Sequence, residues 1–375
     1  MIMKNHCLNS TALLTSLLCL SAAPGLVEAA DAKAPAMAEP QRNNSGGGFY
    51  LNGTLGFNIS AKYSGFGVFP RQTLNGANGL PLSAGDRVYD DGYNLVEGLG
   101  AGDTRTFKWG FASDSQLNAA RPATTAISFN SSTAAAVLGG SSVTGDPQPG
   151  FEMGYLHRLG ELGKGSWGFM AGFGYLNVSL EDKRTYTGNV TRDTDTFATA
   201  PAVIPPAGYD GVAASPFGPR IENVPSGPRV TTLIAGGLTS TGPRSVNADL
   251  FALKLGPYYE LPLCTKCSIT LSGGLVLAAI SSQFSFQEVN NIASINAFGA
   301  AATSQTFAGS NDKMALLPGG FADLRANYSL NDRWSVFAGG QYQYLSSFSQ
   351  SASGRTAKLD FGKTLLVHFG ASYSF

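Results

Sequence analysis

Few side chains in this sequence have the types and spacing that catalysis requires. Cys264 and Cys267 form a Cys-x-x-Cys motif, which occurs in redox enzymes and in one half of many zinc sites. A zinc site needs a second pair of ligands, and beyond residue 29 the sequence has only two histidines, His157 and His368. We therefore expect the two cysteines to form a local disulfide that closes a turn, and we expect no metal or other cofactor.

The histidines give little support for an enzyme. Nucleophilic hydrolysis requires a serine, a histidine and an orienting acid within reach of one another. No His-x-Ser pairing occurs, although Ser372 follows His368 on the same side of an alternating segment. We predict a protein without enzymatic activity, in which His368 hydrogen-bonds to neighbouring charged groups.

Arginine and aspartate residues between the apolar segments could bind an external ligand. Three Gly-Pro-Arg triplets place Arg220, Arg229 and Arg244 on turns stiffened by proline, and guanidinium groups bind phosphates or acidic sugars. Solvated loop tips without a ligand are the alternative, and we prefer it. Four aspartates could hold Ca²⁺ but lack the spacing of a known calcium loop, so we interpret them as turn residues: Asp86, Asp90, Asp91 and Asp103.

The last segment, residues 363–375, shows which kind of element carries these side chains. Its alternate residues are apolar or aromatic, and the residues between them are mostly small or polar: Leu365, Val367, Phe369, Ala371, Tyr373 and Phe375 form the apolar set. Because side chains alternate between the two faces of a strand, this is an amphipathic strand with one apolar face. A soluble domain rarely ends on such an exposed edge, whereas a closed sheet pairs its last strand with its first.

Seven further segments alternate in the same way. With the last one, we predict strands at residues 49–60, 150–159, 166–180, 247–261, 268–283, 313–330, 334–349 and 359–375. Short turns join some of them, and long polar stretches join the others: residues 61–149, 181–246, 284–312 and 350–357. This alternation is typical of transmembrane β-barrels, which have short periplasmic turns and long extracellular loops. Residues 104–111 and 124–130 are also strand-like, so ten strands are an alternative to eight.

On these features the sequence resembles the small bacterial outer-membrane β-barrels of the outer-membrane-protein-A type. The resemblance covers about residues 49–375 and depends on the strand pattern and on the terminal aromatic residues Tyr373 and Phe375. It implies an all-β fold, a transmembrane antiparallel up-and-down barrel in the outer membrane. It also implies that the terminal residues are the mark read by the insertion machinery. The sequence differs from the full-length type because we expect no peptidoglycan-binding domain after the barrel.

The inward set of each predicted strand carries balanced charges. It includes three acids and three bases: Glu152, Arg158, Lys254, Glu260, Asp323 and Arg325. The interior of an eight-stranded barrel is just wide enough for side chains to fill it, and charges removed from water must be paired. We predict that these residues plug the lumen, which favours a structural or surface-interaction role with the long loops facing outside. A small-solute diffusion channel of porin-like type is the alternative.

The N-terminal residues predict export. Lys4 precedes an apolar core at residues 12–23, and Val27-Glu28-Ala29 places small residues around a cleavage point after Ala29. We expect a cleaved signal peptide at residues 1–29 and a disordered periplasmic lead at residues 30–48. The formal net charge is zero, so the sequence gives no case for nucleic-acid binding. The expected partners are outer-membrane lipid, the insertion machinery, periplasmic chaperones and an unidentified external ligand.

Overall fold

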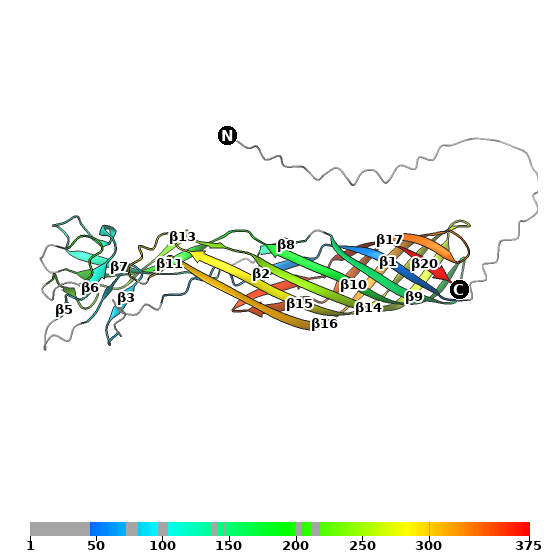
Figure 1. Cartoon of the computed structure of the whole chain (residues 1–375), viewed down its shortest axis with the longest axis horizontal. Coiled ribbons are helices and arrows are strands. Elements are labelled where there is room, and N and C mark those ends of the chain that lie inside the picture. Colours follow the sequence, from blue (N-terminus) through cyan, green and yellow to red (C-terminus); the bar gives the residue numbers. More distant parts are fainter. Residues whose placement is uncertain are drawn as a thin grey trace, which may run out of the picture. The chain divides into compact units, whose positions relative to one another are not determined.

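The computed structural model describes residues 46–72, 82–96, 104–136, 141–145, 147–199, 204–211, 218–299 and 301–375. In these residues the fold is all-β and antiparallel, apart from one 3-10 turn, η2 (Asp114–Gln116) (Figure 1). The predicted all-β, antiparallel fold class is therefore confirmed. The predicted signal peptide and most of the predicted lead lie outside the described residues.

Eight strands form the main part of the sheet. They are β1 (Gly48–Phe57), β9 (Gln148–Leu162), β10 (Gly165–Asp182), β14 (Arg244–Pro262), β15 (Cys267–Asn291), β16 (Ser304–Ser329), β17 (Trp334–Leu345) and β20 (Thr364–Ser374). Each pairs with two others of the set, in the order β1, β9, β10, β14, β15, β16, β17, β20 and again β1. We call this set the ring. Each of its strands overlaps one of the eight predicted strands.

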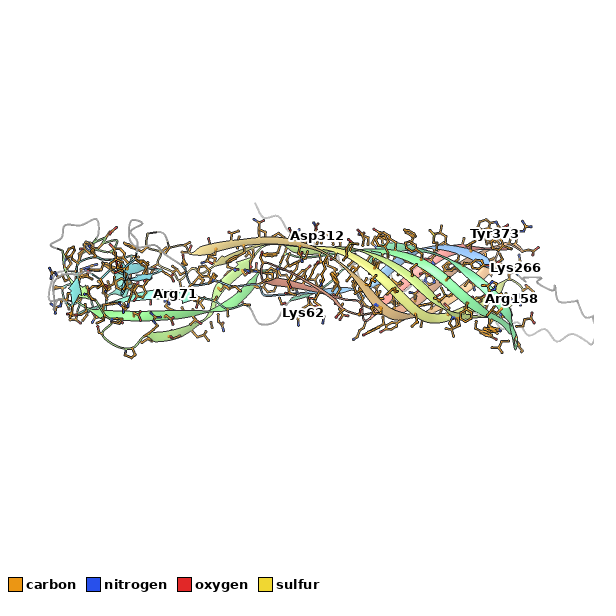
Figure 2. The ribbon with its side chains drawn as sticks, turned by 90° about the horizontal axis from the view of Figure 1, so that it is seen from below. Lys62, Arg71, Arg158, Lys266, Asp312 and Tyr373 are labelled. Atoms are coloured by element: carbon orange, nitrogen blue, oxygen red, sulfur yellow. The ribbon has the colours of Figure 1, made fainter. Side chains whose placement is uncertain are left out.

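Short turns join strands of the ring at one end. Figure 2 labels Arg158, Lys266 and Tyr373 together at this end. Lys266 lies in the turn between β14 and β15, and Arg158 lies near the turn between β9 and β10. We call the end of the ring that carries these short turns the turn end.

The outward-facing side chains of the ring are apolar over a continuous zone, which we call the apolar belt. Its exposed members are Phe49, Leu51, Leu55, Phe151, Met153, Leu159, Trp167, Phe169, Phe251, Leu253, Leu255, Leu271, Leu275, Leu277, Met314, Leu316, Leu324, Tyr328, Trp334, Tyr342, Tyr344, Leu365, Val367, Phe369 and Phe375. Residues between them along each strand point into the ring, because side chains alternate. No helix in the described ranges is long and apolar enough to cross a membrane.

The belt ends at the same level on β10, β14 and β15. Tyr175 of β10 lies opposite Phe251 of β14, and Phe251 lies opposite Ala279 of β15. The next outward residues are polar and are again opposite one another: Asn177, Asp249 and Ser281. These three strands therefore share one boundary, whereas on β16 the belt runs one outward position further, to Met314 opposite Ser281.

Beyond the belt several strands continue. β15 has 25 residues and β16 has 26, which is more than twice the 9–11 residues that a tilted strand needs to cross a bilayer. Next to them lies a second sheet with the order β18 (Phe348–Ala352), β19 (Arg355–Asp360), β2 (Ser60–Ser64) and β8 (Ser141–Thr144). The interior here is apolar, with buried Tyr63, Phe284, Phe286 and Leu359. The prediction that residues 284–312 form a loop is wrong, because both long strands extend into this range.

The remaining strands form a head with its own core. Its strands are β3 (Arg87–Tyr89), β4 (Gly92–Asn94), β5 (Arg105–Thr106), β6 (Trp109–Phe111), β7 (Ala126–Thr133), β11 (Tyr186–Ala198), β12 (Ile221–Glu222) and β13 (Val230–Thr241). Tyr89, Trp109, Phe111, Phe129 and Phe197 are buried together in it. The prediction that residues 61–149 and 181–246 form loops is wrong, because apolar residues within these ranges build strands.

The strands of the head do not enlarge the ring. β5, β6 and β7 cover the two segments that suggested ten strands, and they pair with β12, β4 and β11. Among the described residues none of the three pairs with a strand of the ring. β13 connects the head to the ring, since Thr239–Thr241 pair with Val289–Asn291 of β15.

Candidate functional site

Charged side chains gather inside the ring at the level of the apolar belt. Glu152 of β9, Lys254 of β14 and Arg325 of β16 each lie between exposed belt residues along their strands. The same alternation that turns Met153, Leu255 and Leu324 outward therefore turns these charges inward. All three side chains are buried, as is Asp323 of β16.

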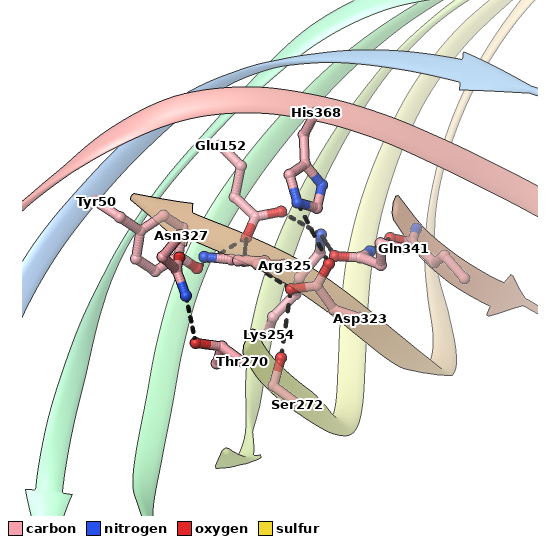
Figure 3. A network of polar contacts seen from close by, with 11 residues as sticks. Tyr50, Glu152, Lys254, Thr270, Ser272, Asp323, Arg325, Asn327, Gln341 and His368 are labelled. Carbon is pink, nitrogen blue, oxygen red and sulfur yellow. Dashed lines mark hydrogen bonds and ion pairs between the residues drawn. The ribbon is translucent and has the colours of Figure 1, made fainter. Parts of the chain in front are cut away.

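The carboxylate of Glu152 is the centre of this cluster (Figure 3). It accepts hydrogen bonds from the Lys254 ammonium and from the Tyr50 hydroxyl, the latter at 2.8 Å. The Arg325 guanidinium lies 3.4 Å from Oε1, the oxygen that also accepts from Tyr50, and it donates to Asp323 at 2.5 Å. We call Tyr50, Glu152, Lys254, Asp323, Arg325, Gln341 and His368 the interior cluster.

Aromatic and amide groups complete the cluster. The Arg325 guanidinium lies over the ring of Tyr50 at 4.3 Å and over that of Phe337 at 5.2 Å. Lys254 donates to Oε1 of Gln341 at 2.9 Å. His368 Nε2 lies 3.5 Å from Asp323 Oδ1, a distance at which an ion pair forms only if the imidazole is protonated. Two carboxylates and two permanent cations thus neutralise one another, which reduces the cost of burying them.

Glycines in the wall make room for this packing. A Cβ atom at Gly154 would lie 2.5 Å from the ring of Tyr50, and one at Gly172 would lie 2.7 Å from its hydroxyl. A Cβ atom at Gly174 would make only ordinary contacts, none closer than 3.8 Å, and Gly174 borders a small cavity lined by residues that include Glu152 and Lys254. Larger residues in this wall would displace Tyr50 from its position under Arg325.

The structure brings together four of the six charges predicted to plug the lumen. The other two, Arg158 and Glu260, lie near the turn end. Arg158 forms an ion pair with Glu161 at 3.0 Å, and Glu260 accepts a hydrogen bond from Ser268 at 2.6 Å. Two further members, Tyr50 and Gln341, were missed because neither is charged. Their inward position on alternating strands is the signal that could have identified them.

A second buried ion pair lies beyond the belt. Arg355 of β19 donates to one oxygen of Glu288 of β15 through Nε at 2.9 Å and through Nη2 at 2.7 Å. Ser240 donates to the other oxygen at 3.0 Å, and the guanidinium lies 4.5 Å from the ring of Phe307. This pair joins the second sheet to the long strands. It was not predicted, because the sequence placed Glu288 in a loop.

The three arginines of the Gly-Pro-Arg triplets have different environments. Arg244 is buried in β14 between the rings of Phe66 and Tyr186, so its predicted place on a loop tip is wrong. Arg229 donates to both oxygens of Asp195 at 2.9 and 2.7 Å. Arg220 lies 6.0 Å from the ring of Phe107.

Three of the four aspartates act as turn residues, as the sequence predicted for them. Asp91 accepts hydrogen bonds from the amide and the side chain of Asn130, and Asp90 accepts one from the Ser132 amide at 2.6 Å. Burial raises the pKa of Asp91 to about 6. Asp86 accepts from the amides of Ser83 and Val96, and Asp103 lies outside the described residues. The described part of the chain has no group of three or more residues that could hold a metal ion.

The two cysteines are free thiols, so the structure does not contain the predicted disulfide. The turn that carries them is closed by the backbone instead. The amides of Leu263 and Cys264 donate to the carbonyl of Cys267 at 2.8 and 3.1 Å. The turn geometry is therefore fixed without a covalent link.

The terminal aromatic residues meet the first strand. β1 pairs with β20 from Gly48 opposite Ser374 to Phe57 opposite Leu365. The rings of Phe49 and Phe375 are 5.5 Å apart, and those of Tyr373 and Phe375 are 5.6 Å apart. The predicted role of Tyr373 and Phe375 in membrane insertion stays a prediction.

No family model and no curated protein matches the sequence. Similar solved structures include Ail, the attachment invasion locus protein of Yersinia pestis, in complex with a heparin analogue (9% identity, 88% of this chain and 99% of that chain, TM-score 0.23). The outer membrane protease OmpT from Escherichia coli is 10% identical, with 89% of this chain and 98% of that chain covered and a TM-score of 0.31. A Pseudomonas aeruginosa FadL homologue is 9% identical, with 88% of this chain and 90% of that chain covered and a TM-score of 0.18. At these TM-scores the matches carry no argument about the site, so the proposals below depend on the strands and side chains.

Proposed function

We propose that this chain is an outer-membrane protein whose ring is a closed eight-stranded transmembrane barrel. The observation that carries the proposal is the apolar belt. On β14 its outward residues run from Phe251 to Tyr259, nine positions along the strand. A tilted strand needs about 9–11 residues to cross the hydrocarbon core, so the belt has the height that a bilayer requires. Export through the predicted signal peptide belongs to this proposal.

The interior cluster supports a plugged lumen. Glu152, Arg325 and Lys254 come from three different strands and meet inside the ring, where their side chains are buried. Open aqueous channels occur in much larger barrels, whereas side chains fill an eight-stranded one. The small-solute channel remains the second candidate, and the small cavity beside Gly174 is the observation that favours it.

The head supports a surface-interaction role. Where the sequence suggested loops, an aromatic core stabilises an ordered scaffold of strands. Trp109 in this core is fully buried, and its indole N–H donates to the carbonyl of Pro219 at 2.8 Å. Ordered strands present loops in fixed positions, which suits recognition of an external partner. We propose no enzymatic role, because the charges of the interior cluster are engaged with one another.

Two measurements test this function. A folded barrel keeps its compact form in detergent until it is heated, so unheated and boiled samples should migrate differently on a gel. Protein inserted into a planar bilayer should then show no steady open level. Identical migration before and after boiling contradicts the barrel. Steady, ion-selective conductance contradicts the plug and favours the channel.

A further inference from the structure

One strand edge in the sheet of the head has no partner strand. The sheet has the order β15, β13, β11, β7 (Figure 1). The outer edge of β7 is covered, because the carbonyls of Ala126 and Asn130 accept hydrogen bonds from the amides of Asn118 and Asp90. β13 pairs with β11 over Val230–Ile234, and within the described ranges no strand pairs with the other edge of this segment. We call Val230–Ile234 the free edge.

The edge is free because β15 leaves it. β15 pairs with β13 only at Thr239–Thr241 and ends at Asn291. The chain then turns, and the Ile295 amide donates to the Ile292 carbonyl at 3.3 Å. Ile292 and Ile295 are buried together with Val190 of β11. The chain after β15 therefore covers a face of the sheet, and no described strand takes its place beside the free edge.

The free edge has the composition of a strand that pairs. Four of its five residues are β-branched, and none is charged: Val230, Thr231, Thr232, Leu233 and Ile234. Val230 and Leu233 are 58% and 65% exposed although they are apolar. Natural proteins usually protect such an edge with lysine, proline or a bulge, and this segment contains none of them. An edge of this kind is suited to the addition of another strand.

A second copy of the same edge matches it. A two-fold axis perpendicular to the sheet beside Thr232 would pair the two edges antiparallel. Val230 would then lie opposite Ile234 of the second copy, and Thr231 opposite its Leu233, so no like charges meet. Such an axis keeps the apolar faces of the two sheets on the same side. A parallel pair would instead place the apolar face of one sheet beside the solvent face of the other.

We propose that the free edge pairs with the free edge of a second copy of this chain, antiparallel about Thr232. The proposal rests on the surface-interaction role proposed for the head, and it names the partner of that surface. Because β13 continues into its pairing with β15 of the ring, antiparallel edges place the two rings at opposite ends of the dimer. Two copies whose rings cross membranes therefore belong to opposing membranes.

The first test measures the mass of the full chain in detergent by light scattering over a dilution series. The native chain should reach the mass of a dimer as its concentration rises. Leu233→Lys and Leu233→Glu should each raise the dissociation constant by roughly tenfold or more, because like charges then lie across the paired edges. An equimolar mixture of the two variants should restore the dimer, since opposite charges then meet.

Val224→Lys is the matched control. Val224 also lies in the head and is 57% exposed, but it is not part of β13. This variant should dimerise as the native chain does. The temperature at which the compact gel form disappears should be the same for all variants, because both side chains are exposed. A native chain that stays monomeric, or equal effects of Leu233→Lys and Val224→Lys on the dimer, overturns the proposal.

A second test separates opposing membranes from a single membrane. Phosphatidylcholine vesicles that carry the native chain should cluster, and vesicles that carry Leu233→Lys should not. A dimer in detergent without clustering of vesicles contradicts the antiparallel arrangement. If no compact gel form exists for the native chain, the barrel proposal itself fails. A compact monomer contradicts only the pairing of the free edge.

Discussion

Glu152 and Arg325 lie 173 positions apart in the chain and form an ion pair of 3.4 Å inside the ring. Their strands are separated by β1, β20 and β17 on one side and by β10, β14 and β15 on the other. β9 and β16 are therefore on opposite sides of the ring, and the contact crosses its interior. Such a contact couples the two walls and fills the space between them.

The first prediction is that Arg325→Ala destabilises the ring and admits ions. The substitution leaves Glu152 and Asp323 with fewer partners in a buried site, and removing one member of a buried pair costs about 3–5 kcal/mol. Urea unfolding of the folded protein in detergent would measure the loss, and planar-bilayer recording would detect leakage. Arg158→Ala is the matched control, because its partner Glu161 is exposed to solvent and ion pairs of this kind contribute about 0–1 kcal/mol. Equal effects of the two substitutions would contradict a plug made by Arg325.

The second prediction concerns the glycine under Tyr50. In Gly154→Ala the new Cβ would lie 2.5 Å from the carbonyl oxygen of Ala171 and 2.5 Å from the tyrosine ring. Overpacking of this kind costs about 1–3 kcal/mol, so the unfolding midpoint should fall. Gly53→Ala is the control, since a Cβ there meets no atom within 4 Å. If both variants unfold at the native midpoint, Tyr50 is not held by this wall.

The strands of the ring could be predicted because apolar residues recur at alternate positions along them. Phe251, Leu253 and Leu255 alternate with buried Ala252 and Lys254, and this pattern alone sets the strand and its inward face. The charged part of the interior cluster followed from the same rule. Which charges meet could not be predicted, because pairing depends on register and depth, and these place Arg158 and Glu260 near the turn end.

The head and the extended strands could not be predicted from alternation. Beyond the belt, outward residues of β15 such as Gln283 and Ser285 are polar, and its inward residues include apolar Phe284 and Phe286, so the lipid-facing signal disappears. The strands of the head are short, and β5 and β12 have two residues each. Proline and glycine around them favoured a loop interpretation. Their order depends on long-range burial of Trp109 and Phe129, which no local pattern reports.

The third prediction is that replacing both Cys264 and Cys267 by serine leaves stability unchanged. Backbone hydrogen bonds close this turn, and a disulfide over so short a loop would add little chain-entropy stabilisation. The temperature of the gel shift should be the same for the native protein and the double variant. Thiol labelling of native protein purified without reductant shows whether the free thiols of the structure persist. A marked drop in the temperature would mean that a covalent link stabilises the turn.

The last prediction concerns the pH dependence of the head. Burial raises the pKa of Asp91 to about 6, above its ordinary value of 3.8, so the folded head holds this proton more tightly than the unfolded chain does. The contribution of Asp91 to stability is therefore largest below about pH 4, falls as the pH rises to about 6, and is constant above that. Its full size is about 3 kcal/mol, because one pKa unit corresponds to about 1.4 kcal/mol. In a W167F/W334F background Trp109 alone reports on the head, and urea unfolding followed by its fluorescence should show lower stability at pH 7 than at pH 5.

Asp91→Asn should remove this difference. Asp114→Asn should keep it, because a hydrogen bond from Arg121 lowers the pKa of Asp114 and its carboxyl stays ionised over this range. If the pH dependence is the same in native protein and in Asp91→Asn, another group titrates.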